Sequence, residues 1–289
     1  ICLLIQMAAT IVVFDFDYTI IDCDSDNLVV DDLGGTALFN ELLKSMSWNS
    51  AAAKMMRELH LQGRSIDEIT QSLRRAPLPR SMIAAIKTAY ALGCELKIVS
   101  DANMFFIETI LKHHELIDCF SEIITNPSYV DEEGKLTISP YHDFATRTHG
   151  CGLCPPNLCK GMIIERIRSS ALAAEEKKRR LIYVGDGKGD YCPSLKLSER
   201  DCLMPRKHFP LWELIYSGST KALVIKAEIH EWTDAEELER VLLRLIGESV
   251  SSDGRCDASR LLPADCKPRR NNMLPSSHDA PSEAPAVPS

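Results

Sequence analysis

Short apolar runs alternate along the chain with longer segments whose apolar residues recur at helical spacing. The short runs are rich in β-branched residues and predict strands, at residues 11–14, 94–100, 121–125, 179–185 and 202–204, the last as an edge strand. The longer segments predict helices, over residues 66–73, 81–92, 102–113 and 161–176, and from a Thr233/Glu236 capping box to about Gly247. Strands that alternate with helices indicate an α/β fold with a doubly wound, mostly parallel sheet.

Residues 28–90 contain no good strand candidate. Leucines and methionines repeat there at helical spacing, and Ser65 and Glu68 form a further capping box. The stretch is longer than a crossover between parallel strands requires. We therefore expect a small all-helical cap at 28–90, inserted after the first strand of a core formed by residues 8–27 and 91–247.

The two ends of the chain differ from this pattern. Residues 249–289 combine six prolines with Ser, Asp and Arg. This composition predicts a disordered tail. The first six residues are too short and uncharged for a signal peptide, so Met7 is the expected start. No apolar run approaches the roughly 20 residues that span a bilayer. We expect a cytoplasmic protein.

Net charge bears on the possible partners, and the cysteines bear on the redox state of the protein. The 289 residues carry a net charge of −8, which argues against nucleic acid or an anionic membrane as partner. The eleven cysteines are scattered through strand-like and helical text, which favours reduced thiols. The oligomeric state stays open.

Polar residues gather where three predicted strands end. The carboxyl ends of parallel strands meet at one edge of the sheet, where open α/β folds bind ligands. The residues concerned are Asp15 and Asp17, Ser100 and Asp101, and Asp186 and Asp190. Lys160 opens a predicted helix and could add a positive charge. A solvated turn after the first strand is the plainer alternative for Asp15 and Asp17.

The irregular stretch at residues 126–159 carries a second candidate site. Cys151-x-x-Cys154 with Cys159, near His142 and His149, has spacing that suggests Zn²⁺. Against this, a full set of four ligands is not evident, and a single Cys-x-x-Cys in a loop is more often free of metal.

The order and spacing of the strand-end residues resemble the four motifs of the haloacid dehalogenase superfamily of phosphotransferases. Asp15-x-Asp17-x-Thr19 resembles the first motif, the strand ending in Ser100 the second, Lys160 the third and Gly185-Asp-Gly-x-x-Asp190 the fourth. The sequence is further similar to the eukaryotic phosphoethanolamine/phosphocholine phosphatase group, and closest to its plant thiamine-phosphate-phosphatase-like members. That resemblance implies a Rossmann-like core with a helical cap.

The residue types fit the hydrolysis of a phosphate ester through an aspartyl-phosphate. Asp15 would be the nucleophile and Asp17 the general acid and base, while Ser100 and Lys160 hold the phosphoryl oxygens. So many carboxylates imply Mg²⁺. The expected ligands are the side chains of Asp15 and Asp186 and the backbone carbonyl of Asp17, with Asp190 in support.

The resemblance places Asp26 and Asp101 in the substrate pocket, where a carboxylate would favour a cationic leaving group. Asp101 could equally be the N-cap of a helix beginning at Ala102. Expected substrates are small phosphorylated metabolites: thiamine monophosphate, phosphocholine, phosphoethanolamine or pyrophosphate. A catalytically silent protein that binds such a ligand, and a phosphotransferase or mutase that passes the phosphoryl group to another acceptor, are the alternatives.

Overall fold

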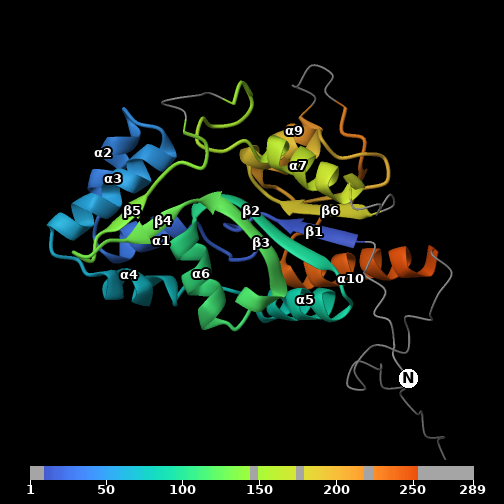
Figure 1. The fold of residues 1–289 in the computed structure, drawn as a ribbon, viewed down its shortest axis with the longest axis horizontal. Coiled ribbons are helices and arrows are strands. Elements are labelled where there is room, and N and C mark those ends of the chain that lie inside the picture. Colours follow the sequence, from blue (N-terminus) through green and yellow to red (C-terminus); the bar gives the residue numbers. More distant parts are fainter. Residues whose placement is uncertain (1–9, 144–148, 174–178, 218–223, 253–289) are drawn as a thin grey trace, which may run out of the picture.

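A parallel β-sheet forms the centre of the molecule (Figure 1). The computed structural model describes residues 10–143, 149–173, 179–217 and 224–252. Six strands pair in the order β3-β2-β1-β6-β7-β8, every neighbouring pair parallel. Their bounds are β1 Thr10–Phe14, β2 Glu95–Asn103, β3 Phe120–Asn126, β6 Arg180–Gly185, β7 Cys202–Pro205 and β8 Glu228–Ile229. The predicted α/β fold with a mostly parallel, doubly wound sheet is confirmed.

Side chains of the central strand alternate between two hydrophobic cores. Val12 and Phe14 pack on the face covered by α5, α6 and α10, whereas Ile11 and Val13 pack with α7 on the other face. The helices on the two faces are α5 Arg80–Ala91, α6 Met104–His113 and α10 Ala235–Ser252, and α7 Lys160–Ala173, α8 Tyr191–Ser194 and α9 Pro210–Tyr216. Figure 1 shows α7 and α9 on one side of the sheet and α5 and α10 on the other.

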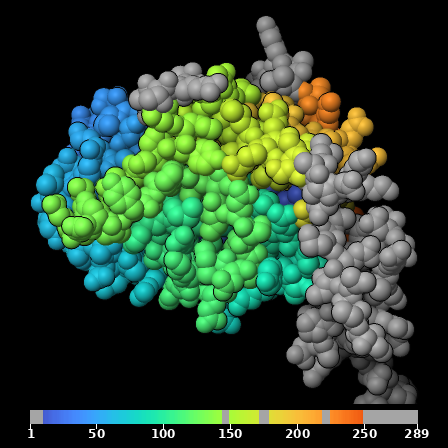
Figure 2. Space-filling view, viewed as in Figure 1, coloured from blue at the N-terminus to red at the C-terminus, as the bar shows by residue number. Residues whose placement is uncertain are grey.

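Four helices follow β1 and lie at one end of the sheet (blue in Figures 1 and 2). They are α1 Ser25–Asp32, α2 Thr36–Leu43, α3 Trp48–Leu61 and α4 Ile66–Leu73. The capping box that begins α4 is confirmed, since Ser65 Oγ accepts from Glu68 N–H and the Glu68 carboxylate accepts from Ser65 N–H. Met55 and Met56 are fully buried in the core. The division into core and cap stays a prediction.

Two local predictions were wrong at the level of single elements. Residues 126–159 are not wholly irregular, because β4 Ser128–Val130 and β5 Leu136–Ile138 pair there as an antiparallel ribbon. β7 is not an edge strand, because the two-residue β8 pairs outside it. Both errors have one cause, since strands of two or three residues are too short to show a periodic pattern.

The ends of two helices also differ from expectation. The residue that caps α6 is Asn103, whose Oδ1 accepts from Phe106 N–H, so Asp101 is not an N-cap. In α10, Asp234 Oδ1 accepts from Glu237 N–H and Glu237 Oε2 from Thr233 N–H, one residue later than predicted. The last described residue is Ser252, and the rest of the predicted tail lies outside the described residues. Among the described helices, none has the length and apolarity that a membrane span requires.

Candidate active site

The end of β1 turns sharply between two neighbouring strands. β1 pairs with β2 on one side and β6 on the other, so the carboxyl ends of the three strands meet there. Tyr18 has a φ of 53°, a left-handed conformation that is costly for a bulky residue. Its backbone is held by a bond from Tyr18 N–H to Cys23 O at 3.0 Å and another from the Arg206 guanidinium to Tyr18 O at 2.8 Å. This turn directs the polar residues of the first motif beyond the sheet edge.

Lys160, the first residue of α7, lies between two carboxylates. Its Nζ is 2.7 Å from Asp15 Oδ2 and 2.8 Å from Asp190 Oδ1. Asp15 is 6% exposed, Lys160 3% and Asp190 0%. Burial alone would lower the pKa of Lys160, but the two carboxylates outweigh burial and raise it well above its usual value. The lysine is therefore a fixed positive charge beside Asp15.

Asp190 is held by donors on both of its oxygens. Oδ1 accepts from Lys160 Nζ and, at 2.6 Å, from Tyr183 O–H, while Oδ2 accepts from the N–H groups of Asp186 and Gly187. A Cβ on Gly185 would lie 2.5 Å from Asp190 Oδ2, so the close approach requires glycine there. Burial would raise the pKa of Asp190, but Lys160 and these donors lower it. Asp190 thus anchors the lysine and the loop after β6.

The remaining carboxylates carry more negative charge than Lys160 balances. Asp15, Asp186 and Asp190 each have an oxygen within 4.8 Å of the others. Burial first, and then the charge of Asp190, raise the pKa of Asp15 well above its usual value and that of Asp186 to about 7. Oxygen donors with uncompensated charge are the ligands that a hard divalent cation prefers. The cluster therefore fits a metal ion.

Hydrogen bonds orient the two outer carboxylates of this cluster. Thr19 O–H donates to Asp186 Oδ1 at 3.1 Å, and Phe16 N–H donates to Asp15 Oδ1 at 2.7 Å. Asp17 lies on the same turn and accepts from Ser25 N–H at 3.0 Å. Burial, followed by the charges of Asp24 and Asp26, raises the pKa of Asp17 well above its usual value.

The predicted residues at the end of β2 lie at the same edge of the sheet. Ser100 is 1% exposed, and its oxygen accepts from Ala102 N–H at 3.2 Å, a bond that does not use the hydroxyl proton. Asp101 is close enough for its charge to act on both Asp15 and Lys160. Its backbone carbonyl accepts from Asn49 Nδ2 at 2.9 Å and from Asn126 Nδ2 at 2.7 Å.

Asp26 lies where the first helices meet the sheet edge. Its Oδ2 accepts from the indole N–H of Trp48 at 2.8 Å, and the residue is 5% exposed. Burial first, and then the charge of Asp24, raise its pKa to about 7, while the indole bond opposes the rise. Trp48 and Asn49, at the start of α3, therefore connect the helices after β1 to the strand-end carboxylates.

A cavity lies beside the candidate site. It has a volume of about 490 Å³ and lies beside the loop after β1 and the starts of α5 and α10, lined by Thr19, Arg206 and Trp232 among others, but the strand-end carboxylates are not among its lining residues. Asp15, Asp186 and Asp190 are buried, whereas Asp17 and Asp101 are partly exposed.

Three residues of the site were not predicted to have a role there: Thr19, Tyr183 and Asn49. Thr19 belongs to the first motif, and this membership could have indicated that its hydroxyl has a role at the site. Tyr183 reads as an ordinary strand residue, and nothing in the sequence indicates that its hydroxyl reaches Asp190. Asn49 lies in a segment predicted to be helical, and its hydrogen-bond partner Asp101 is 52 residues away in the sequence.

Comparisons with known proteins find phosphatases. A model of the family described as "Putative Phosphatase" matches residues 10–246. The chain is 55% identical over 258 residues to inorganic pyrophosphatase 2 of Arabidopsis thaliana, covering 89% of this chain and 91% of that protein. It is 52% identical over 240 residues to a thiamine phosphate phosphatase-like protein of the same plant, covering 83% and 96%. 

Among solved structures, a substrate-bound phosphoserine phosphatase superposes with a TM-score of 0.53 at 15% identity, covering 81% of this chain and 97% of that one. This likeness shows the fold alone. The family model, by contrast, spans the whole α/β core and all four motifs. The chain therefore belongs to this phosphatase family.

Proposed function

We propose that this protein hydrolyses a small phosphorylated metabolite through an aspartyl-phosphate on Asp15. The observation that carries the proposal is the buried contact of 2.7 Å between Asp15 and the Lys160 ammonium. A phosphoryl group that enters beside Asp15 would meet a fixed positive charge at its oxygens, which is what phosphoryl transfer needs. The similarity to curated phosphatases supports the same reaction class.

In the first step, Asp15 attacks phosphorus and the bond to the leaving oxygen breaks. Asp17 gives its proton to that oxygen, which its raised pKa allows. In the second step, Asp17 takes a proton from water, the water oxygen attacks phosphorus, and the bond between phosphorus and Asp15 breaks to release inorganic phosphate. Lys160 and the hydroxyl proton of Ser100 bind the phosphoryl oxygens throughout.

We propose Mg²⁺ as the cation of the acidic cluster. Asp15, Asp186 and the backbone carbonyl of Asp17 would hold it, and it would supply positive charge that lets a carboxylate approach a phosphate dianion. Both oxygens of Asp190 already accept from protein donors. Asp190 therefore fits a supporting position better than direct ligation.

The surroundings of the phosphate site favour a cationic leaving group. Asp26 adds negative charge near Asp17, and Asp101 adds it near Asp15. Negative charge there attracts choline, ethanolamine or thiamine. Pyrophosphate is the second candidate, because the plant relative at 55% identity is named an inorganic pyrophosphatase. The described cysteines are all free thiols, which fits the reducing cytoplasm as the proposed location.

The test is phosphate release by the purified chain, with Mg²⁺ and with a chelator. The panel comprises thiamine monophosphate, phosphocholine, phosphoethanolamine, pyrophosphate and a neutral sugar phosphate. We expect release that requires Mg²⁺, with the highest kcat/KM on a cationic ester. If kcat/KM is instead highest on pyrophosphate, pyrophosphate would be the substrate.

Two results would contradict hydrolysis. Binding of these compounds without any release would indicate the silent protein, and transfer of the phosphoryl group to an added alcohol in preference to water would indicate a phosphotransferase. Both are read in the same assay, by equilibrium dialysis and by product analysis.

A further inference from the structure

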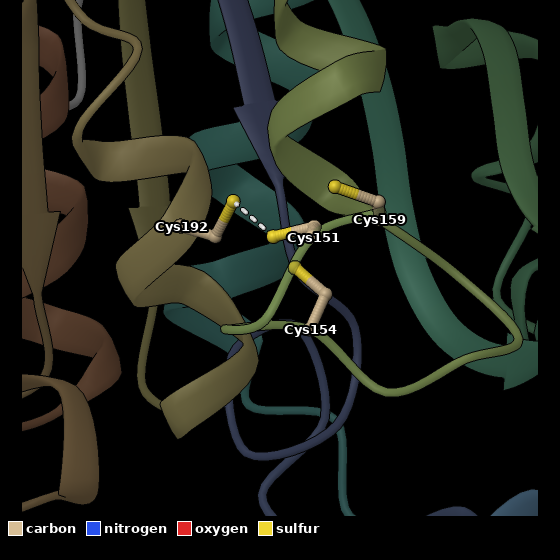
Figure 3. A group of neighbouring side chains, drawn as sticks. All are labelled: Cys151, Cys154, Cys159 and Cys192. Carbon is tan, nitrogen blue, oxygen red and sulfur yellow. Dashed lines mark hydrogen bonds between the residues drawn. The ribbon is translucent and has the colours of Figure 1, made fainter. Parts of the chain in front are cut away.

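Four cysteine side chains converge beside the start of α7. Cys151, Cys154 and Cys159 come from the segment that leads into this helix, and Cys192 comes from α8 (Figure 3). All four sulfur atoms lie within 4.8 Å of one another. Figure 3 shows them directed toward a common centre. The sequence spacing had suggested three of these residues, and Cys192 supplies the missing fourth.

The sulfur positions match a tetrahedral metal site better than a disulfide. Cys151 Sγ and Cys192 Sγ are 3.7 Å apart. A zinc–sulfur bond of about 2.3 Å in a tetrahedron places two sulfurs about 3.8 Å apart, whereas a disulfide bond is about 2.05 Å long. Four thiolates in a tetrahedral arrangement are the usual ligand set of structural zinc.

The surrounding backbone is arranged around these sulfurs. The Nδ1 atom of His149 accepts from Cys151 N–H at 3.1 Å, and its Nε2–H faces the Pro155 carbonyl at 2.9 Å. Both ring nitrogens thus brace the loop, and His149 is not a metal ligand. At the start of α7, the N–H groups of Gly161 and Met162 donate to the sulfurs of Cys192 and Cys159. Such bonds stabilise thiolates that bind a metal.

Gly161 permits this approach. A Cβ at position 161 would lie 2.5 Å from Cys192 Sγ, closer than real contacts allow. The start of α7 and α8 therefore come together at a position that has no side chain.

We propose that Cys151, Cys154, Cys159 and Cys192 bind one structural Zn²⁺ that joins the loop before α7 to α8. The ion lies outside the acidic cluster but next to it in sequence, since Cys159 precedes Lys160 and Cys192 follows Asp190 by two residues. Tying these two cysteines together fixes the relative positions of Lys160 and Asp190. Zinc here supports the active site without taking part in the reaction.

The test measures metal content in the full-length protein, expressed with added zinc and purified in reductant without chelator. Elemental analysis should find about one zinc per chain, as a closed four-thiolate site binds. After exchange for Co²⁺, the protein should show the intense visible bands and sulfur-to-cobalt charge transfer of a tetrahedral thiolate site.

Matched variants locate the ion. Cys154→Ser should lose most of the zinc, whereas Cys119→Ser, a half-buried thiol outside the cluster, should keep it. Asp186→Asn should keep it too, because its carboxylate belongs to the other cluster. If a cysteine variant folds poorly, the cobalt spectrum of the unaltered protein still tests for a tetrahedral thiolate site.

Several outcomes would overturn the proposal. Protein that contains no zinc and shows no thiolate bands with Co²⁺ would mean that the thiols merely pack together. Zinc that survives Cys154→Ser but is lost in Asp186→Asn would place it in the acidic cluster. A Cys151–Cys192 disulfide in mass spectra of alkylated, unreduced protein, or iron in place of zinc, would assign another chemistry.

Discussion

Cys159 and Lys160 are consecutive at the start of α7, yet they belong to clusters of opposite design. In the acidic cluster, Lys160 and the Tyr183 hydroxyl, together with backbone amides, already satisfy Asp190. In the thiol cluster, the four sulfurs lie within 4.8 Å of one another, and those of Cys151 and Cys192 are 3.7 Å apart. Asp190 is thus held by protein donors alone, whereas the proposed Zn²⁺ would hold the thiol cluster together.

Asp15→Asn should have the largest effect on activity and none on the thiol cluster. An amide cannot replace the attacking carboxylate, so we expect kcat to fall about 1,000-fold or more, as for other nucleophile replacements. Phosphate release measures the rate. Zinc content shows whether the thiol cluster is intact, and circular dichroism shows whether the fold is. Full turnover by the folded variant would remove Asp15 as the nucleophile.

Asp190→Asn should damage both stability and activity, because it leaves the buried Lys160 with one carboxylate. Removing one partner of a buried ion pair costs about 3–5 kcal/mol of unfolding free energy. The lysine would also lose its fixed position, so kcat should fall while Asp15 remains intact. Urea unfolding and initial rates measure the two effects.

The matched control for Asp190→Asn is Glu41→Gln. Glu41 also pairs with a lysine, but both partners are largely exposed, and such a pair contributes about 0–1 kcal/mol. Equal unfolding free energies for the two variants would show that the buried pair with Lys160 adds no stability.

Cys154→Ser tests whether the thiol cluster acts on the acidic one. If zinc fixes the segment that carries Lys160, its loss should lower kcat about 10-fold to 100-fold, the usual effect of a supporting residue, and lower the melting temperature. Cys119→Ser should change neither. A variant that has lost its zinc but keeps both the wild-type kcat and melting temperature would separate the two clusters.

The acidic cluster could be predicted from sequence because Asp15 and Asp186 directly follow two strands of a parallel sheet, and Asp190 lies four residues after Asp186. The order of the strands then brings Asp15, Ser100 and Asp186 to one edge whatever the loops do. The thiol cluster could not be completed, because Cys192 lies in a four-residue helix whose direction no periodic pattern indicates. Asp101 was ambiguous for a similar reason, since Asn103, two residues on, caps α6 equally well.

Asp26→Asn should give the smallest effect, on KM alone, and it extends the comparison to the leaving group. The pKa of Asp26 is raised to about 7 by burial and by Asp24, against the Trp48 bond, and Asp101 lies nearby. The side chain is therefore neutral below that pH and anionic above it. KM for phosphocholine should fall as the pH rises through about 7, since only the anion attracts choline.

The control for that pH profile is 3,3-dimethylbutyl phosphate, which has the shape of phosphocholine without its positive charge. Because both esters carry the same phosphate, the ratio of their KM values cancels the titration of the phosphate and of Asp15. In the unaltered protein this ratio should shift about 10-fold across the transition, which corresponds to about 1.4 kcal/mol. In Asp26→Asn it should stay flat. A ratio that shifts equally in both proteins would assign the charge preference to a group other than Asp26, and one that is flat in both would mean that no group titrating near pH 7 senses the charge of the leaving group.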